Sequence, residues 1–141
     1  ENVVVFEFWR FQTIVIGRQS WVKIEEKILR SRNISNTEYE FKSIIRESHL
    51  NAANITHGGY LSALVDAGAG TAAHRASENS PCVTISLDLK FIGTSKIGDE
   101  IFGHVKILKK TKTLVFLFCE LKCNDKIITS ASGVWKILKR S

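Results

Sequence analysis

A histidine followed by two glycines precedes a stretch of small residues that contains a single carboxylate. The tripeptide is His57-Gly58-Gly59, the carboxylate is Asp66, and Asn51 stands six residues before the histidine. The first turn of a helix gathers unsatisfied N–H groups and positive potential, so a glycine-rich helix start is suited to polarising a carbonyl or binding an anion. A carboxylate among apolar residues must be paired, neutralised or functional, because desolvating an unpaired charge is costly. Either motif alone is more often an ordinary turn or a solvated side chain, but together with Asn51 they predict a functional site.

The spacing of His57 and Asp66 predicts a site that two chains share. Nine residues separate them, which on a helix corresponds to about 13.5 Å of rise and two and a half turns. The two side chains therefore point to opposite sides and cannot act together on one small group of a substrate. If both serve one reaction, the aspartate meets the histidine of a second copy, which predicts a symmetric dimer with its site at the interface.

Length and composition are typical of one globular domain. The 141 residues suffice for one core but not for two, so we expect a single domain over 1–141, with 1–17 as an N-terminal extension or helix. No apolar run approaches the roughly 18 residues of a membrane span, so we expect none. Cys82, Cys119 and Cys123 are odd in number and show no CxxC spacing. This pattern predicts no metal site and favours a reducing compartment, the cytoplasm or alternatively the mitochondrion.

Basic residues outnumber acidic ones, giving a net charge of +6. Clustered basic residues favour a polyanionic partner such as nucleic acid, an anionic membrane or a phosphorylated cofactor, although they also occur on solvated strand ends. No zinc-knuckle, RRM or helix-turn-helix pattern accompanies them, so we do not expect nucleic-acid binding. The two clusters are Lys106, Lys109, Lys110 and Lys112, and Lys136, Lys139 and Arg140.

Alternating apolar and polar residues predict an antiparallel sheet around one long helix. Two strands are expected first, from Trp21 to Ile28 and from Tyr39 to Ile45, and then a helix from about His57 to Ser77. The helical segment is apolar nearly all round, so we expect a sheet of about six strands to wrap around it in an α+β layout. Four strands should follow the helix, at Val83–Phe91, from Gly98-Asp99 to Ile107, at Thr113–Lys122 and at Lys126–Leu138.

Two glycines lie inside the predicted helix, at positions 68 and 70. Each costs about 1 kcal/mol relative to alanine in a helix interior. We therefore expect another backbone to approach Gly68 and Gly70 closely, as across a dimer interface.

The order of these residues resembles that of the hotdog-fold acyl-CoA thioesterases. Asn51, five residues, His57-Gly58-Gly59 and, after six more, Asp66 are followed by a strand–Gly-Asp–strand meander. This order is similar to the PaaI-type branch and its mammalian thioesterase superfamily members, over roughly Arg18 to Leu138. The resemblance implies a hotdog fold and hydrolysis of an acyl- or aryl-acyl-CoA to free acid and CoA, without a cofactor.

The resemblance also implies a role for each site residue. The backbone N–H of Gly58 corresponds to the oxyanion donor, and Asp66 of the facing subunit corresponds to the general base or nucleophile. Asn51 matches the residue that holds water or the thioester, His57 the one that orients the site, and Thr84 a hydroxyl residue that positions the water. The implied substrate-binding residues are Gly59, Phe91, Gly93, Thr94, Ser95, Lys96, Lys109, Lys110 and Lys112.

Two positions depart from the family pattern. Relatives often have glycine three residues before the histidine, where this chain has Asn54. Asparagine tolerates a left-handed backbone better than most residues, so we expect the turn to be kept. Thr111 takes a hairpin position where glycine is common, which puts the shape of the CoA phosphate site in question.

Other functions fit the pattern less well. Dehydratases and hydratases on the same fold also use a histidine with a carboxylate, but they place the aspartate before the histidine. A non-catalytic acyl-CoA-binding or interaction module on the hotdog fold is the alternative, although it would not need Asp66. The expected partners are acyl-CoA and further copies of the chain, as a homodimer that pairs into a tetramer.

Overall fold

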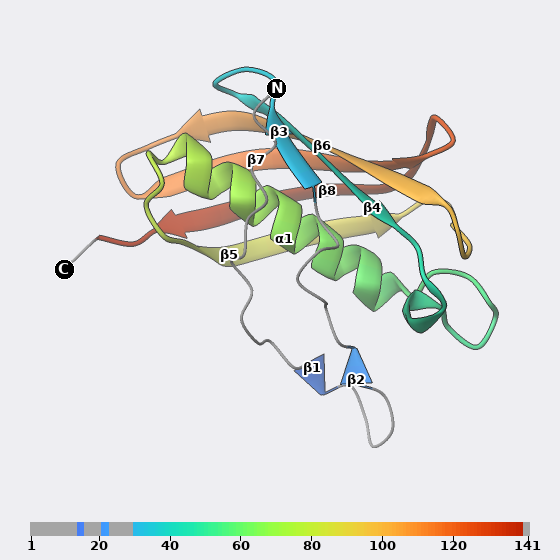
Figure 1. Cartoon of the computed structure of the whole chain (residues 1–141). Coiled ribbons are helices and arrows are strands. Elements are labelled where there is room, and N and C mark those ends of the chain that lie inside the picture. Colours follow the sequence, from blue (N-terminus) through green and yellow to red (C-terminus); the bar gives the residue numbers. More distant parts are fainter. Residues whose placement is uncertain (1–13, 16–20, 23–29, 140–141) are drawn as a thin grey trace.

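Six antiparallel strands and one long helix account for most of the structure, a computed structural model that describes residues 14–15, 21–22 and 30–139 (Figure 1). The first elements are β1 (Ile14–Val15), β2 (Trp21–Val22), β3 (Arg30–Asn33), β4 (Glu38–Ile44) and the 3-10 turn η1 (Glu47–His49). Helix α1 (Gly58–Ala76) then leads into β5 (Cys82–Phe91), β6 (Glu100–Lys110), β7 (Leu114–Cys123) and β8 (Lys126–Ile137).

The sheet has the order β3-β4-β6-β7-β8-β5, and every neighbouring pair is antiparallel. α1 lies across one face of this sheet (Figure 1). β3 and β5 are its two edge strands, so the strand that directly follows the helix has a strand partner within the sheet on one side only. The layout predicted from the sequence is confirmed, since two strands of the sheet precede the helix and four follow it.

The beginning of the strand predicted from Trp21 to Ile28 does not belong to the six-stranded sheet. Trp21–Val22 instead pairs with Ile14–Val15 in a separate two-stranded sheet, and β3 takes the predicted position. The remainder of that predicted strand, within 23–29, and residues 1–13 and 16–17 of the predicted N-terminal extension lie outside the described residues.

α1 begins and ends where the sequence predicts, one residue inside His57 and Ser77. His57 caps the N-terminus, because its Nδ1 accepts the Gly59 N–H at 2.8 Å. At the other end the Ser77 N–H donates to the carbonyl oxygens of Ala73 and His74. No helix in the described part of the chain is long and apolar enough to cross a membrane.

The core lies between α1 and the sheet. Side chains on β6 and β7 alternate between buried and more exposed positions, which is the period of two that predicted these strands. Burying each large aliphatic side chain of this kind typically contributes about 1.5–3 kcal/mol. Fully buried members include Val65 and Ala69 on α1, and Ile101, Val105, Val115 and Leu121 on the sheet.

Gly68 lies against an aromatic side chain of the same chain, so the interface predicted at this position is wrong. A Cβ at Gly68 would overlap the ring of Phe41 on β4, and so would a Cβ at Gly103 on β6. The ring therefore occupies space that both glycines leave open, between the helix and the sheet. A Cβ at Gly70 would lie 3.4 Å from Trp135 Nε1, also in the same chain and at ordinary contact distance.

Replacing Gly68 with alanine should destabilise the protein, because overpacking of a core typically costs about 1–3 kcal/mol. Gly70→Ala is the matched control, since its methyl group has room and alanine is favoured over glycine in a helix by about 1 kcal/mol. Urea or thermal unfolding of both variants measures the effect. The same direction of change in both would contradict a specific role of the Phe41 ring.

Candidate active site

The N–H groups in the first turn of α1 are bound within the chain, with one exception. The Gly59 N–H donates to His57 Nδ1, and the N–H groups of Tyr60 and Leu61 donate to the His57 carbonyl at 2.9 and 3.2 Å. The Gly58 N–H donates to no atom of the described residues. It is therefore the donor of this turn that is left for a ligand, at a helix end where partial positive charge accumulates.

His57 is held at both its backbone and its ring. Its N–H donates to the His49 carbonyl at 2.8 Å, and its Nδ1 accepts the Gly59 N–H. A neutral imidazole that accepts at Nδ1 carries its proton on Nε2. The exposed His57 ring can therefore donate from Nε2 to a ligand beside Gly58.

Asn51 closes the loop that leads into the helix. Its Oδ1 accepts the N–H groups of Ala53 at 2.9 Å and of Ile55 at 3.4 Å, so its amide nitrogen is the part left to contact a ligand. Asn54 has φ 58°, the left-handed conformation that glycine usually supplies. The expectation that asparagine keeps this turn is confirmed.

Asp66 and Thr84 are in direct contact. Thr84 Oγ1 on β5 donates to Asp66 Oδ1 on α1 at 2.6 Å, which leaves Oδ2 of the half-buried carboxylate available. Next to Thr84 the pairing of β5 with β8 is irregular, with a register shift between Thr84 and Ser86. The structure thus brings together two of the predicted residues from separate elements.

The end of β5 lies beside the start of α1. Phe91 is 54% exposed, and its Cζ would be 3.4 Å from a Cβ at Gly58, so a ligand at the Gly58 N–H would meet this ring. Thr94 and Lys96 in the following loop are exposed. Gly93 donates its N–H to the Ile128 carbonyl at 3.1 Å.

Ser95 differs from its neighbours because its side chain is buried. Ser95 Oγ donates to Thr56 Oγ1 at 2.7 Å, and the Ser95 carbonyl accepts the Thr56 N–H at 2.8 Å. The residue therefore ties the loop after β5 to the loop before α1. Its predicted contact with substrate stays a prediction.

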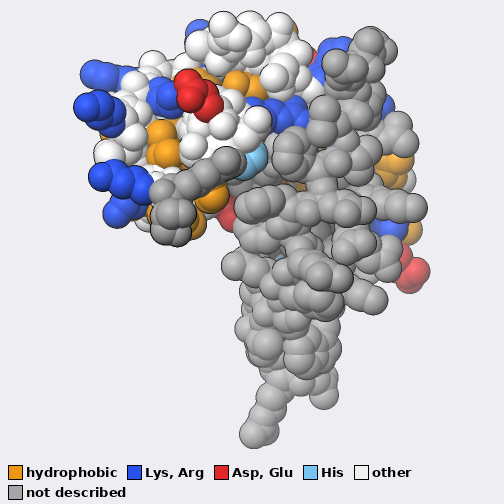
Figure 2. All heavy atoms as spheres, turned by 60° about the vertical axis from the view of Figure 1, so that its left-hand side comes forward, with side chains coloured by type: hydrophobic (Ala, Val, Ile, Leu, Met, Phe, Trp, Pro, Cys, Tyr) orange, Lys and Arg blue, Asp and Glu red, His pale blue; other side chains and the backbone are white. Residues whose placement is uncertain are grey.

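Three of the four lysines predicted to bind substrate, those of the β6–β7 hairpin, lie at the opposite end of the sheet from Gly58, whereas Lys96 lies in the loop after β5. Lys109, Lys110 and Lys112 are exposed at the β6–β7 hairpin, where strand pairing also places the beginning of β5 and the end of β8. Figure 2 turns this side of the molecule forward and shows Lys and Arg side chains standing out along its edge. Within one chain these lysines are not brought to the start of α1.

The sequence did not single out His49, although it is 3% exposed beside the site. Its ring stacks on Tyr60 with centroids 3.7 Å apart, and its Nδ1 accepts the Arg46 N–H at 3.0 Å. Burial, and secondly the charge of Arg46, lower the pKa of His49 below its ordinary value of 6.5. In the sequence, His49 could be noticed only because it stands two residues before Asn51, and its segment has no periodicity that predicts burial.

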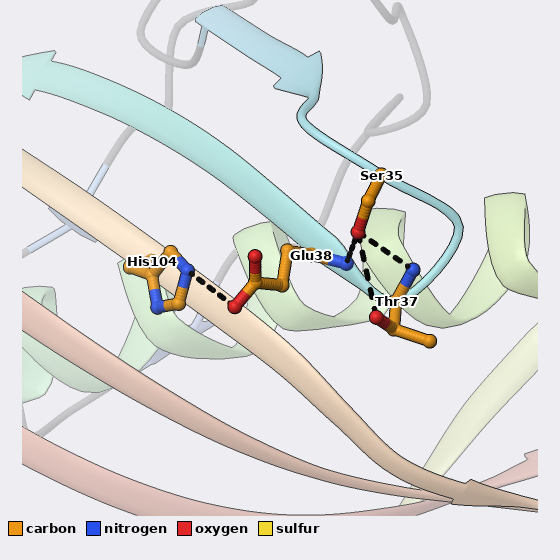
Figure 3. Close-up of polar contacts among 4 residues, drawn as sticks. All are labelled: Ser35, Thr37, Glu38 and His104. Carbon is orange, nitrogen blue, oxygen red and sulfur yellow. Dashed lines mark hydrogen bonds and ion pairs between the residues drawn. The ribbon is translucent and has the colours of Figure 1, made fainter.

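His104 has a partner of its own, away from α1. Its Nε2 lies 3.7 Å from Glu38 Oε1 across β4 and β6, next to the turn that Ser35 Oγ stabilises by accepting the N–H groups of Thr37 and Glu38 (Figure 3). Among the described residues, no group of three or more His, Cys, Asp and Glu side chains is placed to hold a metal ion.

Residues 53–129 match the family model of the thioesterase superfamily, a range that contains His57, Gly58, Asp66 and Thr84. The chain belongs to this superfamily. A candidate esterase of Pseudomonas aeruginosa is 35% identical over 94 residues, which are 66% of this chain and 70% of that protein. Acyl-coenzyme A thioesterase 13 of Mus musculus is 33% identical over 86 residues, 60% of this chain and 61% of that protein.

Several solved structures share the fold of this chain. Zebrafish thioesterase superfamily member 2 has a TM-score of 0.73 at 22% identity and covers 80% of this chain and 83% of its own. A hypothetical thioesterase of Streptococcus pneumoniae with coenzyme A has a TM-score of 0.72 at 16% identity, over 80% of this chain and 91% of its own. The PaaI protein of E. coli has a TM-score of 0.69 at 16% identity and covers 74% and 75%. The hotdog fold implied by the resemblance is confirmed.

Proposed function

We propose that this thioesterase hydrolyses an acyl- or aryl-acyl-CoA to the free acid and CoA. The observation that carries the proposal is the Gly58 N–H, unbonded within the described part of the chain, at the start of the same helix that holds Asp66 against Thr84. A relative named acyl-coenzyme A thioesterase and a structural neighbour with coenzyme A support the substrate class. The reaction uses no cofactor, and three free cysteines favour the cytoplasm, or alternatively the mitochondrion.

The free N–H is suited to the charge that develops during thioester hydrolysis. Attack on the carbonyl carbon moves an electron pair onto the carbonyl oxygen, and Gly58 at the positive end of α1 would donate to this oxyanion. Losing one such donor typically lowers the rate by a factor of about 10² to 10³. The Nε2–H of His57 and the amide of Asn51 would orient the thioester or a water molecule at the same place.

The carboxylate would supply the base. Asp66 would take a proton from water while the water oxygen bonds to the carbonyl carbon. As the oxyanion reforms the carbonyl, the C–S bond breaks, and the proton held by Asp66 passes to the CoA thiolate, which regenerates the carboxylate. Thr84 would hold the carboxylate through Oδ1 so that Oδ2 faces the water. Direct attack by Asp66 as a nucleophile is the alternative and gives the same products after hydrolysis of the anhydride.

Asp66→Asn should keep the fold and remove most of the activity, because the amide cannot accept the proton from water. Asp88→Asn on β5 is the matched control, since Asp88 is an exposed carboxylate that pairs only with Lys90 among the described residues. Thiol release from short, medium, long and aryl acyl-CoAs measures both variants. Wild-type activity in Asp66→Asn would refute the catalytic role, and acyl-CoA binding without thiol release by the wild type would favour the non-catalytic module.

Two chains are needed if His57 and Asp66 serve one reaction. α1 is continuous over Gly58–Ala76, so nine residues put the two side chains about 13.5 Å apart along the axis and on opposite sides. The edge strand β5 exposes Val83 by 45% and Ile85 by 56%, and such an edge is suited to contact with another chain. We therefore place Asn51, His57 and Gly58 of one chain opposite Asp66 and Thr84 of its twofold partner, in a homodimer that pairs into a tetramer.

Mixing two inactive variants should restore activity. Asp66→Asn chains and Asn51→Ala chains, once their subunits have exchanged, form about half mixed dimers, each with one intact and one doubly damaged site. Recovery should therefore approach roughly a quarter of wild-type activity by the same symmetry argument. No recovery after demonstrated exchange would place the whole site within one chain.

A twofold partner would also bring the lysine hairpin toward the site. Replacing Lys109, Lys110 and Lys112 with alanine should raise KM for acyl-CoA, more at low salt than at high salt, because the CoA phosphates are attracted by charge. Lys42→Ala with Lys122→Ala, exposed on β4 and β7 and outside both basic clusters, is the control. An unchanged KM, or an equal loss with a phosphate-free thioester, would place the phosphates elsewhere.

A further inference from the structure

His49 contacts the chain on both sides of Gly58. Its carbonyl accepts the N–H of His57, the residue before Gly58, at 2.8 Å. Its ring stacks on Tyr60, two residues after Gly58, with centroids 3.7 Å apart and planes at 10°. The buried His49 therefore contacts a residue on each side of the Gly58 N–H group.

The position of His49 is itself fixed by a closed turn. The Arg46 N–H donates to His49 Nδ1 at 3.0 Å, and the His49 N–H donates back to the Arg46 carbonyl at 3.0 Å. Both the side chain and the backbone of His49 are thus hydrogen-bonded to Arg46. The ring of His49 and the carbonyl that accepts the His57 N–H therefore belong to one hydrogen-bonded turn.

The hydrogen bond from Arg46 needs a neutral histidine, because only the unprotonated Nδ1 has a lone pair. Burial and the Arg46 charge lower the pKa of His49, which keeps the ring neutral at pH 7. Tyr60 on the facing helix is also neutral, since burial raises the pKa of its phenol, whose oxygen lies 3.2 Å from Ser43 Oγ.

We propose that His49 is the positioning residue for the Gly58 N–H. This inference rests on the proposed thioester hydrolysis, in which that N–H is the oxyanion donor. His49 acts through His57 and Tyr60 and not on the substrate, because it is buried. A misplacement of about 1 Å in a catalytic group can cost a factor of about 10² in rate, so a residue that fixes the donor controls kcat without contacting the ligand.

Two variants of His49 separate its hydrogen bond from its ring. His49→Asn keeps an acceptor for the Arg46 N–H but loses the ring that stacks on Tyr60. His49→Phe keeps a stacking ring but loses the acceptor. Tyr60→Phe is the matched control, because it removes only the hydroxyl group that contacts Ser43.

We expect His49→Phe to lower kcat by a factor of about 10 to 100, with KM nearly unchanged, because the donor moves while the binding surface stays. His49→Asn should recover part of kcat although it melts at a lower temperature than His49→Phe. Tyr60→Phe should keep wild-type kcat. If kcat instead follows the melting temperature across the three variants, His49 is merely structural and the proposal is overturned.

The amide of Gly58 gives a second measurement that does not depend on turnover. Its ¹⁵N–¹H cross-peak should shift in His49→Phe and remain near the wild-type position in Tyr60→Phe. If the wild type releases no thiol from any acyl-CoA, the proposed function fails, and the cross-peak still decides whether His49 fixes Gly58. An unmoved cross-peak with wild-type kcat in His49→Phe would refute the positioning role.

Discussion

The distance between helix and sheet depends on the space around one aromatic ring. Phe41 lies where Cβ atoms at Gly68 and Gly103 would overlap it, so two residues without side chains admit the ring between the layers. Interiors are packed as densely as organic crystals, and a filled position of this kind leaves the helix little freedom to shift. Because α1 carries Asp66 and Gly58, the packing of Phe41 also sets where both chemical groups stand relative to β5.

A single helix serves the candidate site in two different ways. Its first turn provides a backbone donor, because His57 accepts the neighbouring N–H groups and no described residue accepts that of Gly58. Its middle provides a carboxylate that a hydroxyl group from β5 holds at 2.6 Å. The backbone donor tolerates changes of side chain nearby, whereas the carboxylate depends on the identity of one residue.

The sequence predicted features that depend on local periodicity and chain ends. The bounds of α1 followed from His57 and Ser77, and the strands after the helix followed from alternation. Contacts between distant segments could not be predicted in this way. Position 68 requires glycine because the ring of Phe41, which lies 27 residues earlier, occupies the space that a side chain would need. Similarly, no local sequence pattern predicts that the ring of His49 stacks on Tyr60.

The hydroxyl pair of Thr56 and Ser95 joins segments 39 positions apart, and both members are buried. The loop before α1 and the loop after β5 are therefore hydrogen-bonded to each other at this point. The exposed Thr94 and Lys96 flank Ser95, and Thr56 directly precedes His57. The start of the helix and the loop after β5 therefore share one buried hydrogen-bonded pair, Thr56 and Ser95.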